Sequence, residues 1–154
     1  MTPGAPLGAA ELRRRVDRLW TSVEEAGGSR DAVTLVAVTK GFDVAVAELA
    51  ASCDLSDLGE NYAQELLAKA PVLAAGPHPV RWHAIGRLQR NKVRQLAPVV
   101  HRWQTVGRLE LATEIARRAP GARVLVQVNT SGEPAKGGID PTGAPDLVRA
   151  PADL

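Results

Sequence analysis

The chain has 154 residues, 45% of them hydrophobic and 23% charged, which suits one globular domain or part of a larger one. Nineteen basic and seventeen acidic residues leave a net charge of +2, too small by itself to indicate a nucleic-acid partner. One cysteine excludes a disulfide framework, no apolar run approaches the ~18 residues of a membrane span, and we therefore expect a cytoplasmic protein without membrane contact.

Residues 1–8 predict a flexible leader, and apolar residues at helical spacing predict a helix over 9–26 that ends at two glycines. The apolar, β-branched run 33–38 then predicts a strand buried on both faces. The same alternation predicts helices at 43–52, 61–75, 89–98 and 108–119, and strands at 55–59, 81–86, 102–106 and 123–129. A loop rich in glycine and proline follows at 130–145, and residues 146–154 begin another helix.

Five strands alternating with helices predict an α/β fold with a parallel sheet and right-handed crossovers. The strands start about 22 residues apart along the chain. This spacing fits a complete doubly wound sheet of five strands. It fits equally an eight-stranded barrel of roughly 210 to 250 residues that is cut off after its fifth strand. Periodicity does not choose between the two.

Polar residues follow the predicted strands, and the carboxyl ends of parallel strands form the binding face of such folds. Lys40 comes directly after the first strand, so we expect its stem to leave a dry sheet. A desolvated lysine has a lowered pKa and forms a Schiff base with an aldehyde. The alternative, which the pattern by itself favours, is a surface lysine that ends a strand.

Three further residues have a functional and a structural interpretation. Asn61 either faces a ligand or, as the pattern favours, caps the following helix. His83 either lines a pocket or, more commonly for a histidine in a buried strand, is a hydrogen-bonded core residue. Asn129 either contacts a ligand or starts the turn of the next loop. No histidine pair has metal-ligand spacing, so we expect no metal site.

The densest basic stretch is 87–94, which either binds phosphate at a helix N-terminus or, more simply, forms a solvated helix face. The chain lacks a G-x-G-x-x-G fingerprint after its first strand, which argues against a dinucleotide-binding sheet.

Four stretches resemble the pyridoxal phosphate homeostasis proteins, the PLP-binding proteins of YggS/PROSC type. They are residues 35–40, 58–65 and 82–92, together with 126–129 followed by 136–139. The stretches occur in the family's order and spacing, across about residues 10 to 140. The third stretch has eleven residues and is highly specific.

The resemblance implies a (β/α)8 TIM barrel like the N-terminal domain of alanine racemase, with residues 9–154 forming about five of its eight βα units. It implies that Lys40 carries pyridoxal 5'-phosphate (PLP) as a Schiff base, and that Asn61, His83 and Asn129 line the pocket. Members resemble carriers or buffers of PLP without catalytic turnover, and PLP-dependent apoenzymes are possible recipients.

The sequence departs from the family in three places. Gly107 replaces a common aspartate, Thr39 replaces a common serine, and the chain stops at Leu154. Family members continue through three more strands, whose Ser/Gly-rich loop and Arg-Ile-Gly segment hold the PLP phosphate. We therefore expect two open sheet edges and an exposed apolar inner face. The alternatives are a PLP-dependent racemase-like enzyme or decarboxylase, and a non-functional fragment of a PLP-binding protein.

Overall fold

The structure, a computed structural model, describes residues 8–133 and 135–150. Its helices are α1 (Ala9–Glu25), α2 (Val44–Ser52), α3 (Ala63–Ala74), α4 (Val93–Leu96), α5 (Leu109–Arg118) and α6 (Ala144–Arg149). Two short 3-10 helices cover Arg90–Lys92 and Pro141–Gly143. The strands are β1 (Ala37–Val38), β2 (Asp57–Glu60), β3 (Arg81–Ala84), β4 (Val100–Val106) and β5 (Arg123–Val126). The predicted leader lies outside the described residues, except for Gly8, which precedes α1.

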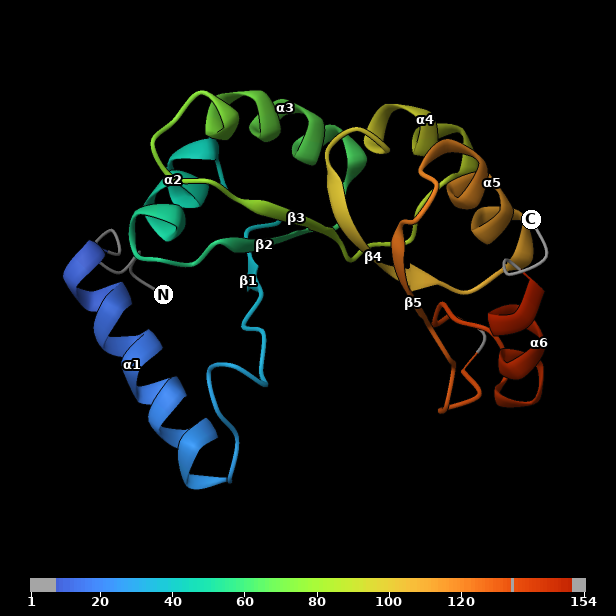
Figure 1. The fold of residues 1–154 in the computed structure, drawn as a ribbon, viewed down its shortest axis with the longest axis horizontal. Helices are drawn as coiled ribbons and strands as arrows, with labels where there is room; N and C mark the ends of the chain where they lie inside the picture. Colours follow the sequence, from blue (N-terminus) through green and yellow to red (C-terminus); the bar gives the residue numbers. More distant parts are fainter. Residues whose placement is uncertain (1–7, 134, 151–154) are drawn as a thin grey trace.

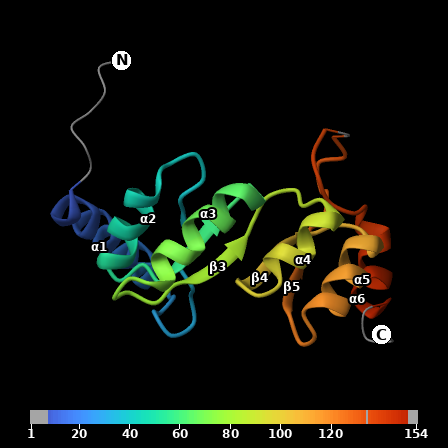
Figure 2. The ribbon, with the colours of Figure 1, turned by 90° about the horizontal axis from the view of Figure 1, so that it is seen from above.

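The five strands form one parallel sheet in the order β1-β2-β3-β4-β5, so each strand pairs with its neighbours in sequence. The sheet curves like an arch, with α2, α3, α4 and α5 along its convex side (Figure 1). The view from above shows these four helices lying across the sheet (Figure 2). A doubly wound sheet reverses its strand order and carries helices on both faces, so the observed order does not fit that alternative.

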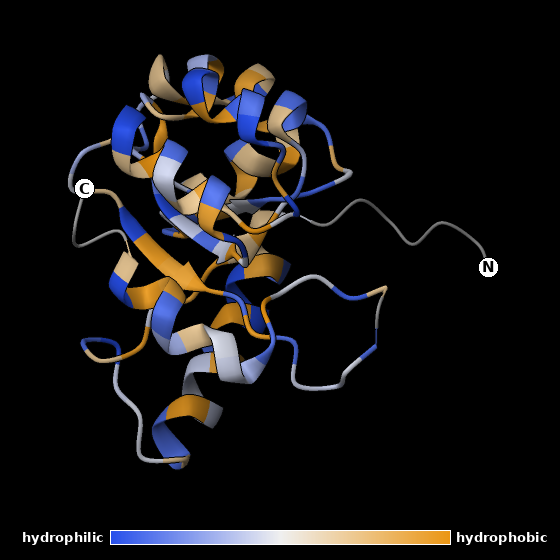
Figure 3. Cartoon of the chain, turned by 90° about the vertical axis from the view of Figure 1, so that its right-hand side faces the viewer, coloured by the Kyte–Doolittle hydropathy of each residue, from blue (hydrophilic) through white to orange (hydrophobic). Residues whose placement is uncertain are grey.

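The hydrophobic core lies between the convex side of the sheet and the helices. The helices carry both hydrophilic and hydrophobic residues (Figure 3). Their buried apolar side chains pack against buried residues of the strands. The apolar side chains that are large and almost completely buried are Leu58, Leu66, Val93, Leu96, Trp103, Val106, Leu111 and Ile115. Among the described residues, no helix has both the length and the apolar composition that crossing a bilayer requires.

The first strand differs most from its prediction. Only Ala37 and Val38 pair with β2, although the apolar run extends back to Val33. The expected burial on both faces is wrong, because Val33 is 38% and Val38 46% exposed. In the described sheet β1 is an edge strand, and its one neighbour β2 begins at Asp57, one residue before the partner of Ala37, so most of the run before Ala37 has no strand to pair with.

The other elements lie close to their predicted places. Asp43 caps α2 by accepting a hydrogen bond from the backbone N–H of Val46 at 3.2 Å. The helix predicted at 89–98 is instead a 3-10 turn followed by the short α4. The loop 130–145 contains a second 3-10 turn, and an isolated parallel bridge joins Val128 to Ile139.

Candidate functional site

Lys40 and Asn61 follow the carboxyl ends of the neighbouring strands β1 and β2. The register pairs Val38 with Gly59, and each of the two site residues comes two positions after this pair. Lys40 is exposed, and within the described residues its amine has no hydrogen-bond or ion-pair partner. The expected dry stem is wrong for this chain, because Val38 on the same face of the strand is itself half-exposed.

A largely buried polar cluster lies at the end of β1, beside Lys40 in the sequence. We call it the Lys69 cluster, and it consists of Thr39, Glu60, Glu65 and Lys69. The Lys69 amine, on α3, donates to Glu60 Oε1 at 2.7 Å and to the Thr39 carbonyl at 2.9 Å. The Thr39 hydroxyl also donates to Glu60 Oε1, at 2.7 Å. The side chains of Lys69 and Glu60 are 5% and 0% exposed.

Glu65 extends this cluster to the residue after Lys40. Its Oε2 lies 3.5 Å from the Lys69 amine and accepts a hydrogen bond from the backbone N–H of Gly41 at 2.8 Å. The Gly41 N–H lowers the pKa of the Glu65 carboxyl, and the Lys69 charge adds to that effect. Gly41 has a φ of +74°, which places the turn after Lys40 in the left-handed region that favours glycine.

Asn61 does not cap the helix that follows it, so the favoured alternative is wrong. The N-cap position of α3 belongs to Tyr62. Asn61 instead packs its backbone against Gly86, where an added Cβ would lie 2.6 Å from Asn61 Cα. It lines a pocket of about 330 Å³, whose basic side chains are Arg87 and Lys92.

His83 is buried and held from both sides. Its Nε2 lies 2.8 Å from Asp57 Oδ1, and its Nδ1 lies 2.6 Å from the Gln104 amide nitrogen. An amide nitrogen only donates, so Nδ1 of the ring accepts this hydrogen bond and Nε2–H donates to the Asp57 carboxylate. This pattern of one donor and one acceptor belongs to the neutral imidazole. Arg81 binds the same carboxylate through two nitrogens, and its guanidinium lowers the Asp57 pKa to about 2.

The register places His83 one layer below Lys40 and Asn61. His83 pairs with Gly59, two residues before Asn61 along β2. Its ring centroid lies 5.9 Å from that of His101, and the two rings border a pocket of about 170 Å³. Burial and the Arg123 charge lower the His101 pKa. This part of the concave face is thus polar and rich in charge.

Asn129 lies beyond β5, at the opposite edge of the sheet from β1. Four strand spacings, or ~19 Å along the sheet, separate these two edges. The Asn129 side chain folds back on its own loop: it donates to the Glu133 carbonyl and accepts from Ser131 and the Gly132 N–H. The structure therefore brings Lys40 and Asn61 together but not Asn129.

The loop after β5 also explains the glycine at position 107. A Cβ on Gly107 would lie 2.9 Å from Gly138 Cα, so the loop leaves no space there for an aspartate side chain. Both glycines line a pocket of about 270 Å³ together with Arg87, Arg108 and Lys136. Lys136 forms an exposed ion pair with Glu133 at 2.6 Å.

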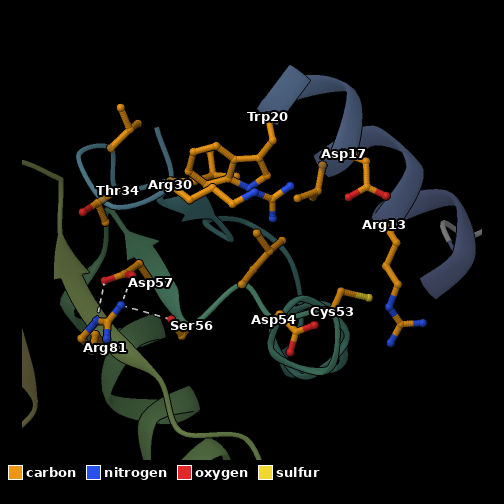
Figure 4. Close-up of a pocket in the computed structure, with 14 residues that line it drawn as sticks. Arg13, Asp17, Trp20, Arg30, Thr34, Cys53, Asp54, Ser56, Asp57 and Arg81 are labelled. Atoms are coloured by element: carbon orange, nitrogen blue, oxygen red, sulfur yellow. Dashed lines mark hydrogen bonds and ion pairs between the residues drawn. The ribbon is translucent and has the colours of Figure 1, made fainter. Parts of the chain in front are cut away.

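A further pocket of about 310 Å³ lies at the other end of the strands, between α1 and the amino ends of β2 and β3 (Figure 4). Arg30 lies over the Trp20 ring, with its guanidinium carbon 5.0 Å from the ring centroid. Ser56 and Asp57 on one side of this pocket bind Arg81. None of the residues predicted from the sequence to form the site lines it.

Known proteins are similar to this chain over nearly its whole length. The chain matches no family model. It is 35% identical over 150 residues to the pyridoxal phosphate homeostasis protein of Pseudomonas aeruginosa, across 95% of this chain and 64% of that protein. The chain is thus similar to pyridoxal phosphate homeostasis proteins across 95% of its own length. It spans slightly less than two thirds of the length of this relative.

Solved structures share the fold of this chain. A protein of unknown function from Bifidobacterium adolescentis has a TM-score of 0.81 and 33% identity, over 95% of this chain and 64% of that one. PipY of Synechococcus elongatus with PLP bound has a TM-score of 0.70 and 26% identity, over 90% of this chain and 64% of that one.

The sequence analysis missed the Lys69 cluster and the Asp57 and Gln104 partners of His83. Lys69 stands on the core-facing side of α3, between Leu66 and Leu73, which are both buried. A lysine at a core-facing helix position, in a chain with fifteen arginines and four lysines, is the signal that could have identified it.

Proposed function

We propose that this chain binds pyridoxal 5'-phosphate as an imine on Lys40 and serves intracellular PLP homeostasis, holding the cofactor without catalytic turnover. The observation that carries the proposal is the place of Lys40: an exposed amine after the carboxyl end of β1, without a partner among the described residues, in a chain similar to pyridoxal phosphate homeostasis proteins. PLP bound to PipY, a structural neighbour, supports the choice of ligand.

The lysines of the chain differ in their fitness for this role. The Lys69 amine is buried and already bonded to Glu60 and Thr39, so it has no access to an aldehyde. Lys136 is paired with Glu133 in the loop after β5. Lys92 lines the pocket next to Asn61 and would lie near a ligand there. Lys40 combines exposure at the strand end with a backbone held on both sides.

The covalent step requires nothing beyond the two reactants. The neutral Lys40 amine would add to the aldehyde carbon, forming a C–N bond while one amine proton passes to the carbonyl oxygen. That oxygen would then leave as water with the second amine proton, which gives a C=N double bond with no change in oxidation state. The reverse reaction with water releases the aldehyde, which suits a protein that holds and returns it.

The remaining site residues have different proposed roles. Asn61 follows the strand next to that of Lys40, and its side chain does not cap α3. We propose that this side chain contacts the bound ring or its substituents. His83 has both ring nitrogens bonded and would form a wall beneath the ligand. For Asn129 the proposal requires its side chain to leave the loop bonds that it makes here.

We propose that the arch is part of a (β/α)8 barrel of the alanine racemase N-terminal type, with five of its eight units in this chain. The sequential parallel order and the helices on the convex side support it. The relatives' additional length, about a third of each, would supply the other units. We also propose a cytoplasmic location and delivery of PLP to apoenzymes.

Borohydride trapping tests the assignment of Lys40. We expect reduction of the chain with PLP, followed by peptide mapping, to place the label on Lys40. Lys40→Arg keeps the positive charge but forms no such imine, so the visible absorbance should disappear. Lys136→Arg is the matched control and should keep it. Label on Lys92 or Lys136 with Lys40 unlabelled would contradict the proposal, and turnover of added amino acids would contradict the carrier role.

A further inference from the structure

The proposed chemistry uses the Lys40 amine alone. The charged groups of the Lys69 cluster therefore have no chemical role in it. The Lys69 cluster places one ammonium and two carboxylates within 3.5 Å contacts next to the end of β1. Within the described residues, Glu60 Oε2 is buried without any hydrogen-bond partner. A cluster of this kind is expensive to bury and needs an explanation.

The contacts of the cluster converge on the two residues that flank Lys40. On the side before it, the Thr39 carbonyl accepts from Lys69 and the Thr39 hydroxyl donates to Glu60. On the side after it, the Gly41 N–H donates to Glu65. The Lys40 amine itself takes no part in the cluster. The Lys69 and Glu65 side chains, one turn apart on α3, therefore hold the backbone on both sides of a free side chain.

Stability alone is a weak explanation for this arrangement. Replacing a buried ion pair by apolar residues of similar volume is often neutral or stabilising, because burial removes both charges from water. Directional bonds to fixed backbone atoms do something that apolar packing does not: they set where the backbone lies. A displacement of about 1 Å of a reacting group lowers reactivity by up to about 100-fold.

We infer that Glu65 and Lys69 are positioning residues, which fix Thr39 and Gly41 and thereby set the place from which the Lys40 amine meets an aldehyde. This inference rests on the proposed function of Lys40. It adds two residues of α3 to a site that otherwise consists of strand ends, and it predicts that backbone order at Gly41 and imine formation at Lys40 change together.

Glu65 is the residue to change, because its side chain is 31% exposed and its removal leaves the Lys69–Glu60 pair in place. Glu65→Ala removes the acceptor of the Gly41 N–H, and Glu65→Gln retains an acceptor oxygen. The matched control is Glu114→Ala on α5, which also removes a carboxylate from helix ion pairs, with Arg117 and Arg118, but has no link to Lys40.

Three quantities are measured on the full chain: hydrogen exchange of the Gly41 amide without ligand, the dissociation constant of the PLP imine by absorbance, and the melting temperature. In Glu65→Ala we expect Gly41 exchange and the dissociation constant each to rise about tenfold. In Glu65→Gln, the Gly41 exchange rate and the dissociation constant should both return most of the way to the wild-type values. In Glu114→Ala, the Gly41 exchange rate and the dissociation constant should stay within about twofold of wild type. This should hold even if the melting temperature falls as much as in Glu65→Ala.

The two proposals fail differently in this experiment. A wild-type chain that gives no borohydride adduct on Lys40 contradicts the proposed function, and Gly41 exchange still decides whether Glu65 holds the backbone. A Lys40 adduct of equal affinity in wild type and Glu65→Ala overturns the positioning role. Equal losses in Glu65→Ala and Glu114→Ala overturn it as well, because they would reflect general destabilisation.

Discussion

His83 shows how hydrogen bonding limits what a residue offers to a ligand. Its Nε2 is engaged by Asp57 and its Nδ1 by Gln104, and the ring is 1% exposed. A ligand in the layer above would therefore meet a ring face or edge and no free nitrogen. His83 is therefore a hydrogen-bonded core residue that lies one layer beneath the proposed site, which combines the structural interpretation with part of the functional one.

Asp57 controls this arrangement through its charge, which predicts a pH dependence. Arg81 and His83 hold its folded pKa at about 2, below the usual unfolded value of ~3.9. A lowered carboxyl pKa gives stability that is fully present above the unfolded value and is lost as pH falls through the folded one. About half of this contribution should be gone by pH 3.

We expect Asp57→Asn to lower the free energy of unfolding at pH 7 by about 1 to 2 kcal/mol, a value that allows for the half-exposed Arg81. The difference from wild type should halve by pH 3, measured by urea unfolding at pH 7, 5 and 3. Asp146→Asn is the control, because Asp146 is 85% exposed and pairs only weakly with Arg149. A difference independent of pH would contradict the role of the Asp57 charge.

At the scale of elements, the backbone after β3 packs closely against the backbone after β2. Gly86 approaches the Asn61 backbone so closely that an added Cβ would lie within 2.6 Å of Asn61 Cα. The carbonyl of Gly86 also accepts a hydrogen bond from the Thr105 hydroxyl on β4 at 2.5 Å. Three consecutive strand ends thus meet where Asn61 turns toward the proposed ligand.

Gly86→Ala should therefore damage both stability and the site. Backbone atoms have less freedom to move than side-chain ends, so we expect a loss of about 2 kcal/mol or more in urea unfolding. PLP imine formation should weaken as Asn61 is displaced. Gly76→Ala is the matched control, since its Cβ would make an ordinary contact of 3.4 Å and we expect no loss. Equal behaviour of the two variants would show that the close approach relaxes easily.

Local patterns in the sequence predict most elements, and non-local pairing explains the misses. The helix α1, the start of α2 at Asp43 and the alternation of five strands with helices follow from periodicity and capping chemistry. The length of β1 depends on whether a second strand lies beside it, which its own residues do not encode. The Asp57–His83 bond joins residues 26 apart, and the Lys69–Thr39 bond joins residues 30 apart. Both require the register of the sheet.

At the scale of the whole molecule, the arch has a covered convex side and an open concave side (Figure 1). The expected exposure of apolar inner-face residues is confirmed at Val38, and Leu125 in β5 is 48% exposed. Lys40 and Asn129 lie at the two edges of this open face. A ligand bound at Lys40 would therefore lie nearer to the β1 edge of the described sheet, and Asn129 would have to reach it from the β5 edge.

The open concave side leads to a prediction about how strongly the 154-residue polypeptide binds the phosphate group of PLP. The resemblance to the family implies phosphate-holding loops after the fifth strand, and the chain spans 64% of its Pseudomonas relative. Each lost charge-assisted hydrogen bond costs ~1.5–3 kcal/mol, so losing two weakens binding by a factor of about 100 or more. The aldehyde reaction at Lys40 would remain and would not distinguish PLP from unphosphorylated pyridoxal.

We therefore expect absorbance titrations to give this polypeptide a dissociation constant for PLP at least about 100-fold higher than that of the full-length Pseudomonas relative. The values for PLP and pyridoxal should differ by less than about tenfold in this chain and by far more in the relative. Tight binding selective for PLP would contradict this and would indicate a phosphate site among its own basic residues. Arg87, which lines both pockets beside the strand ends, is the first candidate, and Arg87→Gln would then abolish the selectivity.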